Sequence, residues 1–114
     1  MPEGEEMNHE EYLKFHKEAC EKLVSITAAK NHDYAGGGNH AFKNFTMVEA
    51  LGITSTEQGF LTRMTDKMTR IINFVNSGVL KVQDEKIEDT LFDLANYSIL
   101  LAGYIRSKRE QENG

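Results

Sequence analysis

Two long segments without proline leave this chain few choices other than a helical fold. The only proline is Pro2, so residues 55–78 and residues 84–108 contain none. Proline interrupts helices because it lacks an N–H group and its ring clashes with the preceding turn. In both segments the apolar residues recur three or four positions apart, which is the period of an amphipathic helix. The short link between them predicts an antiparallel helix hairpin.

Residues that commonly begin or end helices stand at the borders of the expected elements. Gly78 is a natural C′ residue, because glycine adopts a left-handed backbone without steric cost. Candidate N-caps precede three elements: Asn8, either Thr54 or Ser55, and Asp84. These signals predict a small all-α bundle in one domain, residues 1–114, with frayed ends at residues 1–7 and 110–114. Beside the hairpin we expect an N-terminal helix over residues 8–30 and a short helix over residues 44–51.

Each hairpin helix is expected to carry a polar stripe beside its apolar face. On residues 55–78 the apolar face comprises Leu61, Met64, Met68, Ile71, Ile72 and Val75, and the polar stripe comprises Arg63, Asp66, Arg70 and Asn73. On residues 84–108 the polar stripe comprises Glu85, Asp89, Asp93 and Asn96. Acids one helical turn apart repel one another, so a cation, a metal or water must offset them. The two stripes form either an inter-helix ion-pair ladder or the wall of a site, and spacing alone does not decide which.

Composition argues against several classes of function. A net charge of −5 disfavours a nucleic-acid backbone as partner, yet a few local cations suffice to hold a small phosphorylated ligand. No run of about 18 apolar residues is present and the acidic N-terminus lacks a signal-peptide core, so we expect no membrane partner and a cytoplasmic location. Cys20 is the only cysteine, which excludes an intramolecular disulfide and a zinc finger. Its place at the edge of an apolar face predicts a buried, inert thiol.

The most unusual stretch is NHDYAGGGNHAFKN, residues 31–44. Three consecutive glycines are costly inside a helix, so residues 36–38 predict a loop whose N–H groups can approach a ligand closely. The spacing matches neither a Walker A loop nor a Rossmann fingerprint. The stretch is therefore either a ligand-binding loop or a mobile linker with surface histidines. Its polar side chains, candidates for ligand binding, include His32, Asp33, Tyr34, Lys43 and Asn44.

We also expect a homo-oligomer. A bundle of this size leaves apolar surface uncovered, and the methionines at positions 47, 64 and 68 are adaptable packing residues. A site shared between subunits would explain how a small bundle encloses a ligand.

Three runs of the sequence together resemble a known family. KNHDY, RMTDKMTRIINF and DEKIEDTLFDLANYSILL look like the first of the nucleotide-modification-associated domain families, small proteins common in phages and prophages. The resemblance covers residues 30–101, and its motifs are the DK-xx-R pattern that begins at Asp66 and the EDTL-x-DLANY run of residues 88–97. It implies a phage-type protein that acts on a nucleotide or a nucleotide-derived small molecule in the host cytoplasm.

More distantly, the helical order and the acidic helix are similar to the MazG-type all-α nucleoside triphosphate pyrophosphohydrolases. That similarity implies that carboxylates bind magnesium, which bridges phosphates and helps to orient an attacking water. Asp89 and Asp93 would be the catalytic metal ligands, with Glu85 or Asp66 as the third. The ligand-binding residues would be Arg63, Lys67 and Arg70 at the phosphates, with Asn96 and Tyr97 orienting the ligand or a water.

One departure from the MazG pattern bears on catalysis. MazG-type enzymes carry an EExxE cluster on one helix that faces an ExxD pair on a later helix. Here the facing helix has Asp66 among three cations, and these can neutralise the acids and leave no metal site. The sequence thus leaves three hypotheses open: a magnesium-dependent nucleotide pyrophosphohydrolase, a non-catalytic protein that sequesters a nucleotide such as a host defence signal, and a structural protein whose stripes merely pair.

Overall fold

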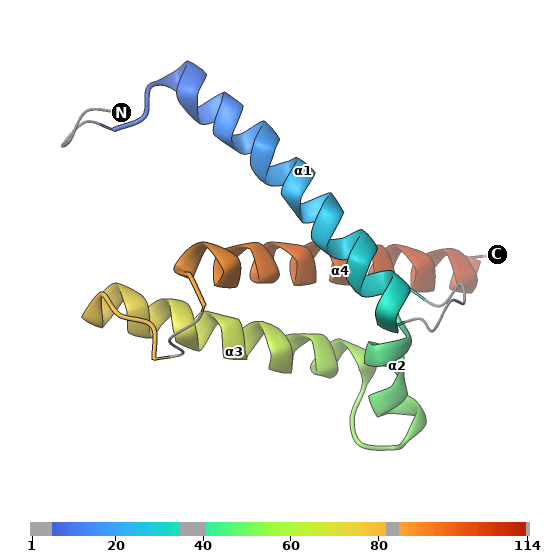
Figure 1. Cartoon of the computed structure of the whole chain (residues 1–114). Helices are drawn as coiled ribbons and strands as arrows, with labels where there is room; N and C mark the ends of the chain where they lie inside the picture. The colour runs from blue at the N-terminus through green and yellow to red at the C-terminus, as the bar shows by residue number, and fades with distance from the viewer. Residues whose placement is uncertain (1–5, 35–40, 82–84, 114) are drawn as a thin grey trace.

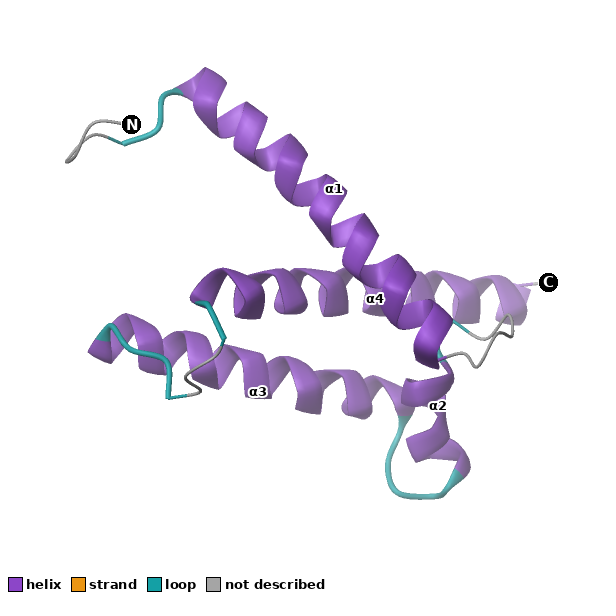
Figure 2. Ribbon diagram, in the orientation of Figure 1, coloured by secondary structure: helices purple, strands orange, loops and turns teal. Residues whose placement is uncertain are grey.

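The computed structural model describes residues 6–34, 41–81 and 85–113, and these residues form helices joined by turns, with no strand among them. The helices are α1 (His9–Tyr34), α2 (Lys43–Ala50), α3 (Thr56–Ser77) and α4 (Ile87–Asn113). Figure 1 shows α3 and α4 side by side and antiparallel, α2 beside the start of α3, and α1 crossing α4 obliquely. Figure 2 shows that the N-terminal half of α1 projects away from the other helices. None of the described helices is both long enough and apolar enough to span a membrane.

The predicted hairpin is confirmed, and so are the end signals at Ser55, Gly78 and Asn8, whereas its second helix begins at Ile87 and not directly after residue 84. Ser55 is the N-cap of α3, and its side chain accepts a hydrogen bond from the backbone N–H of Gln58. Asn8 does the same for α1, accepting from the N–H of Glu11 at 2.9 Å. Gly78 ends α3 with a φ of 77°, a left-handed conformation that favours glycine. The all-α class follows from these local signals.

Two helices are longer at their C-terminal ends than predicted. α1 continues beyond Lys30 to Tyr34, and α4 continues beyond Lys108 to Asn113, where a frayed tail was expected. In both extensions the added residues include neither glycine nor proline, so nothing local forces the helix to stop. The candidate N-cap Asp84 and the glycines at 36–38 lie outside the described residues.

The core is a small aromatic cluster where α2, α3 and α4 meet. Among the described hydrophobic residues only Phe45 and Phe60 are buried, and their rings stack with centroids 4.0 Å apart. Tyr97 and Tyr104 of α4 pack against these two rings. Gly59 lets α2 approach α3, because a Cβ there would lie 3.0 Å from a methyl group of Val48. This contact fixes α2 beside the aromatic core.

Two burial predictions are wrong. Cys20 is exposed, because the N-terminal half of α1 has no neighbouring helix among the described residues. The predicted apolar face of α3 is also exposed over much of its length, because α3 turns an adjacent flank, with Phe60 at its centre, towards α2 and α4. The exposed members of that face are Leu61, Met68, Ile72 and Val75.

Candidate functional site

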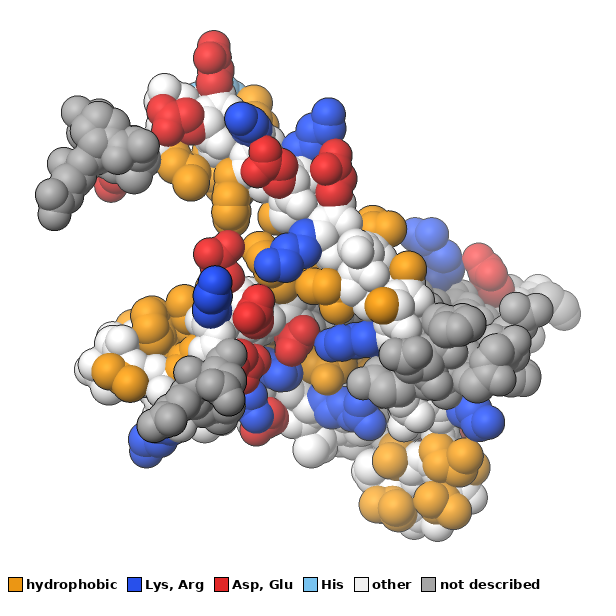
Figure 3. All heavy atoms as spheres, viewed as in Figure 1, with side chains coloured by type: hydrophobic (Ala, Val, Ile, Leu, Met, Phe, Trp, Pro, Cys, Tyr) orange, Lys and Arg blue, Asp and Glu red, His pale blue; other side chains and the backbone are white. Residues whose placement is uncertain are grey.

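A hollow opens where the C-terminal part of α1, the start of α2 and the facing sides of α3 and α4 meet. Its lining combines cationic, amide, aromatic and aliphatic side chains. The lining residues are Thr27, Lys30, Ala41, Lys43, Asn44, Phe45, Arg63, Asp93, Asn96, Tyr97 and Leu100. Three cations and one acid give this lining a local charge of +2, whereas the whole chain carries −5. Figure 3 shows Lys and Arg side chains gathered below the C-terminal part of α1.

Aromatic packing positions one of these cations. The ring of Phe45, in the first turn of α2, stacks on the ring of Phe60. The guanidinium carbon of Arg63 lies 4.7 Å from the centroid of the same Phe45 ring. A cation over an aromatic face is attracted by the ring quadrupole, so this contact holds the guanidinium in place. Tyr97 contacts Phe45 edge-on and completes an aromatic wall.

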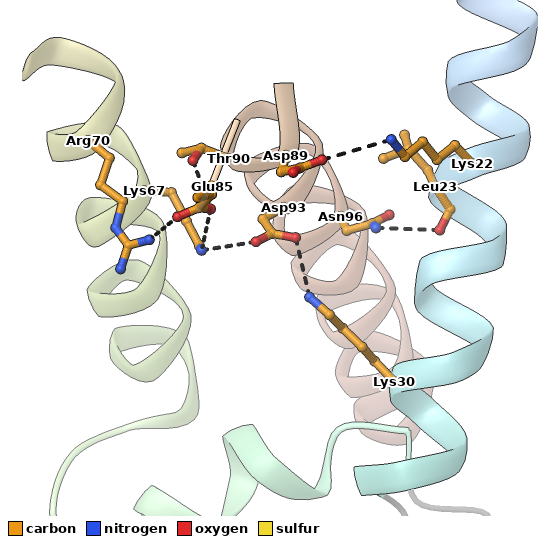
Figure 4. A network of polar contacts seen from close by, with 10 residues as sticks. All are labelled: Lys22, Leu23, Lys30, Lys67, Arg70, Glu85, Asp89, Thr90, Asp93 and Asn96. Carbon is orange, nitrogen blue, oxygen red and sulfur yellow. Dashed lines mark hydrogen bonds and ion pairs between the residues drawn. The ribbon is translucent and has the colours of Figure 1, made fainter. Parts of the chain in front are cut away.

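Asp93 joins the hollow to a network of ion pairs on the neighbouring helices. One carboxylate oxygen of Asp93 accepts from Lys30 Nζ at 3.2 Å, and the other lies 2.9 Å from Lys67 Nζ. Figure 4 shows Asp93 between these two lysines, which come from α1 and α3. The Asp93 and Lys67 side chains are only 20% and 13% exposed, so solvent screens this pair weakly.

Glu85 and Asp89 are paired with cations as well. Glu85 binds the Arg70 guanidinium, lies 3.7 Å from Lys67 Nζ, and accepts a hydrogen bond from the Thr90 hydroxyl at 2.9 Å. Asp89 lies 3.8 Å from Lys22 Nζ of α1, and both side chains are about half exposed. The repulsion among Glu85, which precedes α4, and the acids of α4 is therefore offset by lysine and arginine side chains from both neighbouring helices.

These contacts shift two pKa values. Burial opposes ionisation of Asp93, but hydrogen bonds and the charges of Lys67 and Lys30 outweigh it, so the pKa of Asp93 lies below its ordinary value. Burial likewise opposes the ammonium form of Lys67, but the hydrogen bond to Asp93 and the charges of Asp93 and Glu85 outweigh it and raise the pKa of Lys67. Both groups are charged at neutral pH, and each holds the other in that form.

The predicted site residues fall into two connected groups. The structure brings six of them together at the hollow: Lys43, Asn44, Arg63, Asp93, Asn96 and Tyr97. The others with described side chains belong to the ion-pair network beside it: Asp66, Lys67, Arg70, Glu85 and Asp89. The side chains of His32, Asp33 and Tyr34 lie outside the described part of the chain. The stripes are thus an ion-pair ladder along one part and the lining of a hollow along another.

Asn96 has a structural role in addition to lining the hollow. Its side chain is buried, and its amide N–H donates to the backbone carbonyl of Leu23 at 3.4 Å. This bond ties α4 to α1 where the two helices cross. It therefore helps to fix the distance between the two sides of the hollow.

Sequence reasoning missed several lining residues, of which Lys30 matters most. Lys30 follows Leu23 and Ile26 on the same stripe of α1, at helical spacing. A lysine on an otherwise apolar stripe must find a partner, and this signal pointed to the site. Phe45 lies in the short helix that was expected over residues 44–51, and its ring also lines the hollow. The remaining missed residues are Thr27, Ala41 and Leu100.

The predicted magnesium ligands do not form a ready cation site. Among the side chains that the structure describes, which leave out those of residues 31–34, no three from His, Cys, Asp or Glu gather closely enough to hold a metal. Each proposed ligand, Glu85, Asp89 or Asp93, instead faces a lysine or an arginine. A magnesium ion would have to displace these ammonium groups. Magnesium at this place stays a prediction.

Comparison with known proteins gives one match. A family model described as nucleotide modification associated domain 1 matches residues 30–102. This span contains α2, α3 and most of α4, and it includes all the lining residues of the hollow except Thr27. No curated protein and no solved structure matches the chain. These comparisons give no support to the more distant similarity to the MazG-type enzymes.

Proposed function

Because this chain belongs to the nucleotide modification associated domain 1 family, we propose that it binds a nucleotide or a nucleotide-derived small molecule in the hollow between its four helices. One observation carries the proposal. An acidic chain concentrates three cations and an aromatic wall around a single hollow. Phosphate groups need cations and a nucleobase needs an apolar face, and the hollow offers both.

The cationic side of the hollow is the proposed phosphate site. Lys30 and Lys43 supply ammonium groups, and Arg63 supplies a planar guanidinium that can donate two parallel hydrogen bonds to a phosphate. Asp93 holds Lys30 by a hydrogen bond, which orders its side chain before a ligand arrives. The contact with the Phe45 ring likewise orders the Arg63 side chain before a ligand arrives. Cations ordered in advance lose less side-chain entropy on binding.

The apolar part of the lining is the proposed site for the base or sugar. Tyr97 and Leu100 of α4 provide apolar surface, and Tyr97 is packed edge-on against Phe45. The side-chain amide of Asn44 carries both donors and an acceptor and can read the edge of a base. An aromatic surface with one nearby amide favours a ligand that is part apolar and part polar, as nucleosides are.

We favour binding without cleavage. Glu85, Asp89 and Asp93 each face a cation of the chain itself, which disfavours the binding of a metal ion at these carboxylates. A phage-type protein that sequesters a host nucleotide signal fits such a site. In that role tight binding alone suffices.

Magnesium-dependent hydrolysis is the second candidate. It is favoured by the position of Asp93, which lines the hollow and stands one turn from Asp89 on the acidic stripe. A ligand whose phosphates draw Lys30 away from Asp93 would expose that carboxylate to a cation. Hydrolysis then requires that Asp93→Ala abolishes turnover while the fold survives.

A thermal-shift screen tests the proposal and separates the two candidates. Nucleotides and cyclic nucleotides are tested with and without magnesium, and each hit is recovered after denaturation and analysed by chromatography. A ligand at about 100 times its Kd stabilises the folded state by about 2.7 kcal/mol, which is readily measured in a small domain. We expect a shift without magnesium and an intact ligand. A magnesium-dependent shift with altered ligand would favour hydrolysis, and the absence of any hit would refute the proposal.

Variants locate the binding site. Arg63→Ala removes a side chain from the hollow and should abolish the shift of any hit. Arg106→Ala is the matched control, because Arg106 is an exposed arginine of α4 outside the hollow. Equal loss of the shift in both variants would mean that the ligand binds by charge alone, elsewhere on the surface.

A further inference from the structure

The chain exposes far more surface than a folded monomer of its size. Its accessible surface is 8677 Å², whereas a monomeric protein of 12.9 kDa is expected to expose about 6,300 Å². The difference is about 2,400 Å², and half of it would already exceed the roughly 800 Å² that each partner buries in a stable complex. The radius of gyration, 17.0 Å, is likewise above the roughly 13 Å of a compact domain of this length.

Part of this surface is apolar and lies on the hairpin. A groove between α3 and α4 is lined by Leu61, Met64, Thr65, Met68, Leu94 and Ser98. The exposed side chains of Ile72 and Val75 continue it along α3. We call these eight residues the hairpin face. None of them is charged, and Met68 at its centre is 48% exposed. An uncharged apolar surface of this extent is typical of an interface rather than of solvent-facing surface.

We propose that a second copy of this chain covers the hairpin face. Two observations favour a copy over a different protein. The excess surface of the whole chain, about 2,400 Å², is large enough for each copy to bury the roughly 1,000 Å² or more that one partner of a permanent homodimer buries. The face also lacks the charged residues that would make copies of net charge −5 repel at the contact, or that would select a partner of opposite charge.

A two-fold pairing suits this surface. In such a pairing each copy presents the same patch, so a mixed stripe of leucine, isoleucine and methionine can interdigitate with itself. Two hairpins packed face to face give four helices around a shared apolar layer, which is the geometry of a four-helix bundle. The second copy would supply the core that the single chain lacks, since only Phe45 and Phe60 are buried among its described hydrophobic residues.

The pairing leaves the hollow accessible. Lys67 and Met68 are neighbours in α3, and successive helix positions point in directions about 100° apart. Lys67 faces the ion pairs with Asp93 and Glu85, whereas Met68 lines the groove on a different side of the helix. Each copy therefore keeps its own hollow, on a side of the hairpin away from the contact. The pairing does not depend on the proposed ligand.

Analytical ultracentrifugation of the full chain tests the pairing. We expect the wild type to sediment as a dimer or larger at micromolar concentration, and Met68→Glu to shift the mass to the monomer. Thr62→Glu is the matched control, because Thr62 is exposed on α3 outside the groove and should leave the mass unchanged. A monomeric wild type would overturn the proposal, and so would a Met68→Glu variant with the mass of the wild type.

Cross-linking tests whether the hairpin face is the contact between two copies, should Met68→Glu fail to fold. In a Cys20→Ser background, which removes the only native thiol, Met68→Cys should be captured as a covalent dimer by a short bismaleimide. Thr62→Cys should remain a single chain under the same conditions. Equal capture of the two variants, or capture of neither, would show that the hairpin face is not the contact.

Discussion

Replacing Lys67 with methionine tests whether the ion-pair network stabilises the fold. The Lys67 ammonium group lies 2.9 Å from an Asp93 oxygen and 3.7 Å from a Glu85 oxygen. The three side chains are 13%, 20% and 17% exposed, so solvent does not replace the lost contacts readily. Methionine keeps the apolar stem of lysine and removes only the charge and the hydrogen bonds. The change therefore reports on the polar contacts rather than on packing.

The expected loss of stability depends on the ion pairs that remain after Lys67 is replaced. Removing one partner of a fully buried pair costs about 3–5 kcal/mol, but here Asp93 keeps Lys30 and Glu85 keeps Arg70. The cost is then closer to that of a hydrogen bond to a charged group, and we expect the free energy of unfolding to fall by about 2 kcal/mol. In a domain of this length such a loss lowers Tm by roughly 6–12 °C. Urea unfolding followed by circular dichroism measures it.

Lys108→Met is the matched control. Lys108 also lies 2.9 Å from a carboxylate, that of Glu57, but these two side chains are 46% and 40% exposed. The shorter contact has the same length in both pairs, but the Lys108 pair is more exposed and Lys67 also lies near Glu85, so this substitution should cost a small fraction of what Lys67→Met costs. Equal losses in the two variants, or a Lys67→Met variant as stable as the wild type, would refute the reasoning from burial.

Three further predictions concern the fold. Phe60→Ala removes the fully buried ring at the centre of the aromatic core and should cost about 3–5 kcal/mol in urea unfolding; a cost below about 1 kcal/mol would mean that the core lies elsewhere. Gly78→Ala forces a side chain into a left-handed backbone with φ of 77° and should cost about 1 kcal/mol, although a Cβ there meets no other atom; an equally stable variant would contradict the assigned turn. The pKa of Asp93 is lower in the folded chain than in the unfolded chain, so the ionised carboxylate stabilises the fold at any pH above its unfolded pKa of about 3.9. This stabilisation is lost as pH falls through the lower folded pKa, so the free energy of unfolding should drop below about pH 4. The raised pKa of Lys67 predicts a loss of stability at the alkaline end: its contribution to the free energy of unfolding should persist up to about pH 10 and be lost above it. If the free energy of unfolding of Lys67→Met depended on pH as that of the wild type does, both pKa shifts would be contradicted.

Local chemistry made the hairpin predictable. The helical period of residues 55–78 and 84–108, the N-cap serine at position 55 and the glycine at position 78 each act within a few residues, so the sequence alone indicates them. The glycines at 36–38 predict a stop soon after α1, but neither they nor any other local signal predict that residues 31–34 and 109–113 continue the helices, since this depends on marginal propensities.

The site was predictable on the hairpin and not on α1. Helix periodicity predicts the polar stripes that carry Arg63 and Asp93. One stripe lies on each helix of the hairpin, so the two are expected to lie near each other. Which side of α1 docks on α4 is decided by long-range packing, so spacing indicates that Lys30 needs a partner but not that this partner is Asp93. The same reason explains the exposed hairpin face. Periodicity shows that a face is apolar but not whether this chain or another covers it.

Titration of the hit from the nucleotide screen into magnesium-free protein tests the proposed site most directly. Lys43 lines the hollow, whereas Lys81 is an exposed lysine outside it. We expect Lys43→Ala to raise the Kd at least tenfold, equivalent to about 1.4 kcal/mol, and Lys81→Ala to leave it unchanged. An unchanged Kd in Lys43→Ala, or an equal rise in both variants, would contradict binding in the hollow.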